Sequence, residues 1–198
     1  MNAITSIDIK QVSKYFPANG QKKGFKALDN ATFSIKPGEF VCILGPSGCG
    51  KSTLLSLIAG LEMPSGGALL IDGKPVQGPY TDSGIVFQKD LLLPWRTALD
   101  NVLIQAEARG LDAEKFKDRA HQLLKLVNLQ DFANFYPHEL SGGMRQRVSI
   151  CRALLHDPQL VLMDEPFAAL DAITRDQLAI DFDKFVQAGQ RTVVFITH

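Results

Sequence analysis

A glycine-rich stretch between an apolar run and a helical pattern has the composition of a phosphate-binding loop. It fits GxxxxGK[ST] with Gly45, Pro46, Ser47, Gly48, Cys49, Gly50, Lys51 and Ser52, and Thr53 follows directly. Glycines let backbone N–H groups turn toward phosphate oxygens, and the helix start adds the positive end of its dipole. Lys51 is expected to reach the β- and γ-phosphates, Ser52 to contact Mg²⁺, and Thr53 to approach the α-phosphate. The stretch predicts a nucleoside triphosphate site.

Two carboxylates, Asp164 and Glu165, follow a second apolar run, LVLM. At the C-terminal end of a buried parallel strand they would lie where open α/β sheets bind ligands. Asp164 is expected to hold Mg²⁺ through water, and Glu165 to polarise an attacking water molecule. Pro166 disfavours helical backbone in the residue before it, so Glu165 is expected to be extended. In a chain with a phosphate loop, the pair predicts hydrolysis.

A second glycine-opened segment, LSGGMRQR, spans residues 140–147. Ser141, Gly142 and Gly143 would place free N–H groups and a dipole end at a helix start, which makes an anion site. Taken alone, the segment would be an ordinary helix start with Ser141 as its cap. Because the phosphate loop already supplies one anion site, the segment raises the question of which phosphate it serves.

The elements that must position these residues follow from hydrophobic patterning. Period-two alternation near residues 7–12 and 33–35 predicts half-buried antiparallel strands. FVCILG predicts a buried parallel strand, SGGALLIDG an edge strand, and GIVFQ, LVLMDEP and TVVFITH further strands. Apolar stripes at helical spacing run through residues 116–127 and 144–155. The pattern predicts one domain, 1–198, with an α/β core in 1–88 and 157–198 and a helical subdomain in 89–156.

Composition excludes several classes of protein. The 198 residues are 45% hydrophobic, with Lys+Arg 21 and Asp+Glu 21, so no basic surface for nucleic acid is expected. The cysteines, Cys42, Cys49 and Cys151, are odd in number and scattered, which predicts reduced thiols. No apolar run approaches the roughly 18 residues of a membrane helix, and MNAITSIDIK has no signal-peptide pattern. A soluble cytosolic protein is expected.

The order of these motifs, together with Gln88 and the segments ALD and ITH, resembles the nucleotide-binding subunit of an ABC transporter. The resemblance covers nearly the whole chain. It implies a P-loop NTPase (RecA-like) core with an antiparallel β subdomain and an inserted α-helical subdomain, which binds ATP and Mg²⁺. It also implies that two subunits, expected to be identical, sandwich two ATP molecules head to tail. The second glycine-opened helix then serves a γ-phosphate held by the partner.

Further residue roles are implied by the resemblance alone. Phe16 matches an aromatic that stacks on adenine, with Tyr15 as the alternative. Gln88 matches a glutamine that touches Mg²⁺ and water and senses the membrane partner. Asp171 matches a loop that links the two sites, and His198 a switch histidine that bonds the γ-phosphate and positions Glu165. Two positions depart from the family pattern: Met144 replaces the usual Gln, and Ala168 a frequent Ser.

The segment KDLLLPWRTALDNV, which follows Gln88, indicates a transport role. Leu91, Leu92, Leu93 and Trp95 form an apolar patch that could dock on a membrane subunit or pack within the helical subdomain. The segment resembles importers of nitrate, sulfonates and taurine, and a glutamate-glycine loop usual in exporters is missing. The resemblance implies permease subunits that span the membrane, an external substrate-binding protein, and a peripheral position on the cytoplasmic face of the inner membrane.

The family continues past His198 with a further helix and strands, so the resemblance implies a C-terminally truncated chain with low stability and weak hydrolysis. Two alternatives stay open: a soluble ABC-type ATPase outside transport, and a nucleotide-binding fragment with compromised catalysis. A soluble ATPase that acts on nucleic acid would carry coiled-coil or zinc-bearing inserts, which the sequence lacks. A small-molecule kinase would leave LSGGMRQR unexplained. The favoured hypothesis is an importer ATPase.

Overall fold

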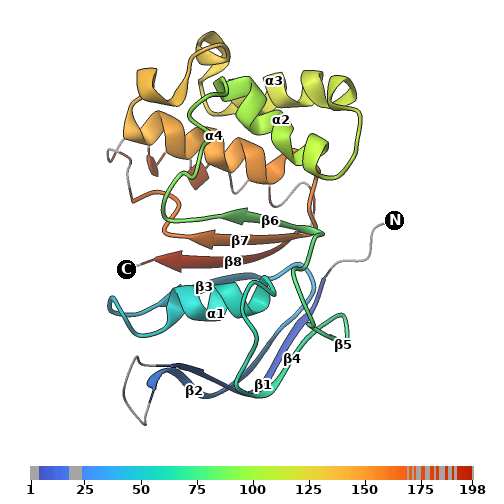
Figure 1. Cartoon of the computed structure of the whole chain (residues 1–198), viewed down its shortest axis with the longest axis vertical. Helices are drawn as coiled ribbons and strands as arrows, with labels where there is room; N and C mark the ends of the chain where they lie inside the picture. Colours follow the sequence, from blue (N-terminus) through green and yellow to red (C-terminus); the bar gives the residue numbers. More distant parts are fainter. Residues whose placement is uncertain are drawn as a thin grey trace.

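The computed structural model describes residues 5–17, 24–168, 170, 172, 175, 176, 179, 180, 182, 186, 189 and 191–197. Two sheets and a group of helices form successive layers (Figure 1). An antiparallel sheet and helix α1 (Lys51–Ile58) lie on one side of a parallel sheet. Helices α2 (Ala98–Ala108), α3 (Lys117–Leu126) and α4 (Gly142–Leu154) lie on the other.

The antiparallel sheet has the strand order β2-β1-β4-β5. Its strands are β1 (Ile7–Phe16), β2 (Phe25–Ile35), β4 (Gly66–Ile71) and β5 (Lys74–Pro75). Ile7 faces Ile35 on one side and Ile71 on the other, which confirms the predicted antiparallel pairing. The predicted edge position of β4 is wrong, because the chain reverses at Asp72 and Gly73, both with positive φ, and adds β5 beyond it.

The parallel sheet has the order β3-β8-β7-β6. Its strands are β3 (Phe40–Leu44), β6 (Ser83–Val86), β7 (Leu160–Asp164) and β8 (Thr192–Thr197). Alternate residues of β7 enter different cores: Leu160 and Leu162 pack toward α1 and the antiparallel sheet, whereas Val161 and Met163 pack toward the helices. The central strands β7 and β8 are therefore mainly apolar, because both of their faces are covered.

Strand β3 corrects one prediction. FVCIL was expected to be buried, yet Phe40 is 46% and Leu44 68% exposed. The reason is its place in the sheet: β3 pairs with β8 on one side and is the outermost strand of this sheet in the described part of the chain. The residue types in a strand do not show whether the strand will lie at the centre or at the edge of its sheet.

The helical layer contains α2 (Ala98–Ala108), α3 (Lys117–Leu126) and α4 (Gly142–Leu154), with short 3₁₀ turns at η1 (Ala113–Phe116), η2 (Gln130–Phe132) and η3 (Pro137–Glu139). The predicted stripes are buried in it, among them Leu124, Val148 and Leu155. Burial raises the pKa of Cys151 to about 12, so this thiol is inert packing. Within the described residues, none of the helices combines the length and the apolarity needed to cross a membrane.

Two titratable groups in the turn before β7, His156 and Asp157, make the stability of the fold depend on pH. Burial, assisted by the charges of Arg109 and Arg119, lowers the pKa of His156 to about 4 from 6.5. Burial opposes ionisation of Asp157, but its ion pairs with Arg191 and Arg119 outweigh this and lower its pKa. Protonation of either group therefore favours the unfolded chain.

We expect stability to fall between pH 6.5 and pH 4, chiefly through His156, by at most about 1.4 kcal/mol per pH unit. Urea unfolding midpoints at pH 7.5, 6 and 5 measure the effect. His156→Gln should flatten the dependence over this range, whereas His121→Gln, at an exposed position, should not. An unchanged pH dependence in His156→Gln would show that another group is responsible.

Candidate active site

The phosphate loop connects the end of β3 to α1. Gly50 has φ 98°, and a Cβ there would lie 2.3 Å from the carbonyl oxygen of Ala27, so only glycine fits. Lys51 is 8% exposed, and its ammonium donates to the carbonyl oxygens of Gly45 at 2.6 Å and Pro46 at 2.9 Å. None of the described carboxylates pairs with Lys51. A buried cation held only by neutral oxygens fits an anionic ligand.

A cavity of about 340 Å³ opens beside this loop. It is lined by Phe25, Ala27, Ser47, Gly48, Gly50, Lys51, Ser52, Thr53, Gln88 and Glu165. The fold thus brings most of the predicted phosphate loop together with Gln88 and Glu165, which come from the ends of β6 and β7. The loop residues Gly45, Pro46 and Cys49 line no part of it; they shape the loop, in which Cys49 N–H donates to Pro46 at 3.4 Å.

Glu165 lies at a sharp turn out of the sheet. Its N–H donates to the carbonyl of Ile196 at 3.0 Å, and its carbonyl accepts from Ala168 at 3.1 Å. Its φ is 47°, in the left-handed region, so the expected extended backbone is wrong. The two hydrogen bonds hold a conformation that costs a non-glycine residue about 1–2 kcal/mol. The turn places the carboxylate in the cavity, where Gln88 Nε2 donates to Oε2 at 3.1 Å.

The residues predicted to bind Mg²⁺ come from three elements. Ser52 and Gln88 line the cavity, and Asp164 is buried at the end of β7, directly before Glu165. No cluster of three or more His, Cys, Asp or Glu capable of holding a metal occurs in the described ranges. One hydroxyl, one amide and one carboxylate fit a Mg²⁺ ion that takes its other oxygens from substrate phosphates and water.

The aromatic residues beside the site differ in part from the prediction. Phe16 ends β1, opposite Phe25 of β2, and the ammonium of Lys14 lies 4.9 Å from its ring centre. Neither Phe16 nor Tyr15 lines the cavity, but Phe25 does, and it is 62% exposed. Sequence reasoning missed Phe25; the available signal was a large aromatic at the first residue of a strand, next to a polar loop.

The second glycine-opened helix lies apart from the cavity. Ser141 caps α4, its hydroxyl accepting from the N–H of Met144 at 3.2 Å. Ser141 and Gly142 are exposed and, like Gly143, line no part of the cavity. Helix α4 and helix α1 pack on opposite faces of the parallel sheet (Figure 1). Asp171 and His198 fall outside the described residues.

The apolar patch after Gln88 divides into two parts. Trp95 is 71% exposed and Leu91 is also exposed. Leu92, by contrast, packs against the helical core. Packing within the helical subdomain is therefore confirmed for Leu92, whereas docking on a membrane subunit stays a prediction for Leu91 and Trp95.

The family model for the ABC transporter matches residues 28–168. The chain belongs to the ABC transporter family. An ABC transporter ATP-binding protein of Methanocaldococcus jannaschii, described as uncharacterized, is 47% identical over 97% of this chain and 71% of the relative. A taurine import ATP-binding protein of Rhizobium johnstonii is 49% identical over 87% of this chain and 66% of its own length. An aliphatic sulfonates import ATP-binding protein of Bacillus cereus is 42% identical over 98% of this chain and 75% of its own length.

Solved structures agree with this ABC assignment. A dimeric ATP-binding cassette in a post-hydrolysis state with ADP and Pi has a TM-score of 0.89 and 36% identity, over 97% of this chain and 88% of that one. The predicted P-loop NTPase fold, the ligands ATP and Mg²⁺, and ATPase activity as an importer subunit are confirmed. ABC subunits of this kind work as dimers with permease partners and associate peripherally with the membrane.

Proposed function

We propose that this chain hydrolyses ATP between two copies of itself and thereby drives uptake of a taurine-like, sulfonate or nitrate ion through permease subunits, from the cytoplasmic face of the inner membrane. One observation carries the proposal: the cavity joins the phosphate loop to Gln88 and Glu165, whereas Ser141, where a second anion site is proposed, lies at a separate, exposed helix start.

Within one chain, the phosphate loop holds ATP. The ammonium of Lys51, which now bonds to two loop carbonyls, is placed to transfer to phosphate oxygens, and the loop N–H groups surround the same phosphates. Ser52, Gln88 and Asp164 would hold Mg²⁺, which supplies positive charge to the phosphate oxygens. Phe16 remains the proposed base-stacking residue, and Phe25 is a further aromatic against the same ligand.

Glu165 is the proposed general base. It orients a water molecule against the γ-phosphorus and accepts its proton. In the present geometry its Oε2 accepts from Gln88, so a water that takes this place would displace Gln88. His198 is proposed to bond the γ-phosphate beside Glu165, and Asp171 to link the two sites; both proposals rest on the family resemblance.

Across the dimer, Ser141, Gly142 and Gly143 are proposed to bind the γ-phosphate held by the second copy. The exposed N-terminus of α4 presents its N–H groups and the positive end of its dipole, which favour a phosphate oxygen. Closure of the two copies around ATP then completes each site, and reopening follows hydrolysis.

The exposed residues Leu91 and Trp95 are proposed to dock on a permease subunit. They follow Gln88 closely in the chain, so movement of Gln88 can be passed to that partner. An external substrate-binding protein is proposed to select the ion, as the family resemblance implies.

The proposal is tested by uptake. Cells in which this gene is deleted should lose uptake of labelled taurine, an alkanesulfonate or nitrate, and should regain it with the intact gene. Lys51→Ala should fail to restore it, because the buried cation for phosphate is gone. Normal uptake of all three ions in the deletion strain would refute the substrate class.

A further inference from the structure

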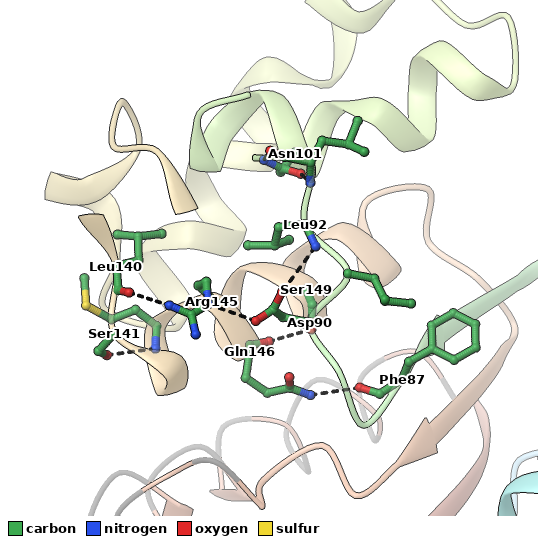
Figure 2. Close-up of polar contacts among 12 residues, drawn as sticks. Phe87, Asp90, Leu92, Asn101, Leu140, Ser141, Arg145, Gln146 and Ser149 are labelled. Carbon is green, nitrogen blue, oxygen red and sulfur yellow. Dashed lines mark hydrogen bonds and ion pairs between the residues drawn. The ribbon is translucent and has the colours of Figure 1, made fainter. Parts of the chain in front are cut away.

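Side chains of helix α4 form hydrogen bonds with the loop that carries Gln88 (Figure 2). The side chain of Gln146 donates to the carbonyl of Phe87 at 3.1 Å, just before Gln88. Just after it, the guanidinium of Arg152 donates to the carbonyls of Asp90 and Leu91, each at 2.7 Å. Leu91 has φ 48°, an unfavourable value that these contacts hold in place. The loop conformation therefore depends on α4.

Arg145 adds a contact between this loop and the residue before the start of α4. Its Nε donates to Asp90 Oδ2 at 2.9 Å, and its Nη1 donates to the carbonyl of Leu140 at 2.7 Å. Figure 2 shows the guanidinium between these two oxygens. Leu140 directly precedes Ser141, and Asp90 also accepts from the N–H of Leu92 at 3.3 Å. One planar side chain thus joins the Gln88 loop to the residue that positions Ser141.

We propose that the Asp90–Arg145 pair couples the two nucleotide surfaces of one chain: the cavity with Gln88 and Glu165, and the helix start at Ser141 that faces the partner's nucleotide. Arg145 is a positioning residue, since it lines no part of the cavity. Binding that moves Gln88 shifts Asp90, and Arg145 transmits the shift to Leu140 and Ser141. The inference rests on the proposed roles of Gln88 and Ser141.

The Asp90–Arg145 pair is suited to transmitting a movement from the Gln88 loop to Leu140 rather than to stabilising the fold. Its side chains are 35% and 28% exposed, where an ion pair contributes little to folding. The pair fixes geometry, because the planar guanidinium of Arg145 makes two hydrogen bonds at fixed angles, one to the Asp90 carboxylate and one to the Leu140 carbonyl. The loss of Asp90 charge would leave the loop anchored to α4 by Gln146 and Arg152 but would remove its direct ion pair with Arg145, the side chain that also bonds Leu140.

Amide hydrogen exchange in the Glu165→Gln protein tests the coupling within one chain. At a concentration where light scattering reports monomer, Mg-free ATP is expected to slow exchange in the peptide covering residues 140–147. Asp90→Asn and Arg145→Gln should each remove most of this change, while the affinity for ATP stays within twofold. Glu107→Gln breaks the Arg96–Glu107 ion pair, of similar exposure, in the same helical layer and should leave the change intact.

A dimer titration adds a second readout. The ATP concentration for half-maximal dimer should rise about three- to tenfold in each single variant, and no further in the double variant, because both remove the same link. The coupling is refuted if ATP leaves residues 140–147 unaffected in the parent, if Asp90→Asn keeps the change, or if the two single effects add. Absence of a dimer in the parent would instead refute the proposed sandwich, and the exchange experiment on the monomer would still decide the coupling.

Discussion

Glu165→Gln is expected to lower ATP turnover by at least about a hundredfold, because an amide cannot accept the proton of the attacking water. ATP binding should be retained, since the substitution leaves Lys51 and the loop N–H groups unchanged. With hydrolysis blocked, the ATP-bound dimer should accumulate. Steady-state phosphate release and light scattering with Mg-free ATP measure the two effects.

The control for this variant is Lys51→Ala, which should lose both turnover and the ATP-dependent dimer. Glutamine has the length of glutamate and bears the same left-handed backbone at position 165, so backbone strain is unchanged between the two proteins. Persistent turnover in Glu165→Gln would remove Glu165 from the role of base.

Ser141→Asp is expected to abolish the ATP-dependent dimer while the chain still binds ATP. Aspartate caps helices as well as serine does, so α4 should remain folded. Its carboxylate, however, would stand against the γ-phosphate of the partner's nucleotide and repel it. Ser141→Asn supplies the matched control, since it keeps a cap without charge and should dimerise. Both are compared in the Glu165→Gln background by light scattering.

Mixing two inactive proteins separates the two surfaces of the chain. In a dimer of one Lys51→Ala chain and one Ser141→Asp chain, the phosphate loop of the second meets the unaltered helix start of the first. One of the two sites is then complete, so the mixture should recover turnover that neither protein has alone. No recovery, together with normal dimers of Ser141→Asp, would show that α4 serves no partner nucleotide.

Much of the fold could be predicted because its signals are local. Period-two alternation near Ile7 and the apolar run before Asp164 each point to one type of strand, and the glycine pattern before Lys51 fits one kind of turn. The meeting of Lys51, Gln88 and Glu165 in one cavity was expected from the family resemblance, and it depends on strands ending at one edge of the sheet.

The structure differs from the prediction where contacts between distant parts of the chain determine the position or the backbone of a residue. The exposure of Phe40 depends on which strand ends the sheet, and the position of Phe25 on how β1 and β2 pair beside the loop. The left-handed backbone of Glu165 overrides the preference that Pro166 imposes, since hydrogen bonds to Ile196 and Ala168 fix the turn. Local sequence carries none of this information.

Among the described strands none pairs with the outer side of β3, so a strand from another molecule can add there. Along FVCIL there is no lysine or proline of the kind that guards such borders in natural sheets, and apolar Phe40 and Leu44 are accessible. Molecules joined there would share backbone hydrogen bonds whether or not nucleotide is present, and the joining could continue into open-ended aggregates. Concentrated solutions of this chain should therefore contain a background of association that ATP neither promotes nor reverses.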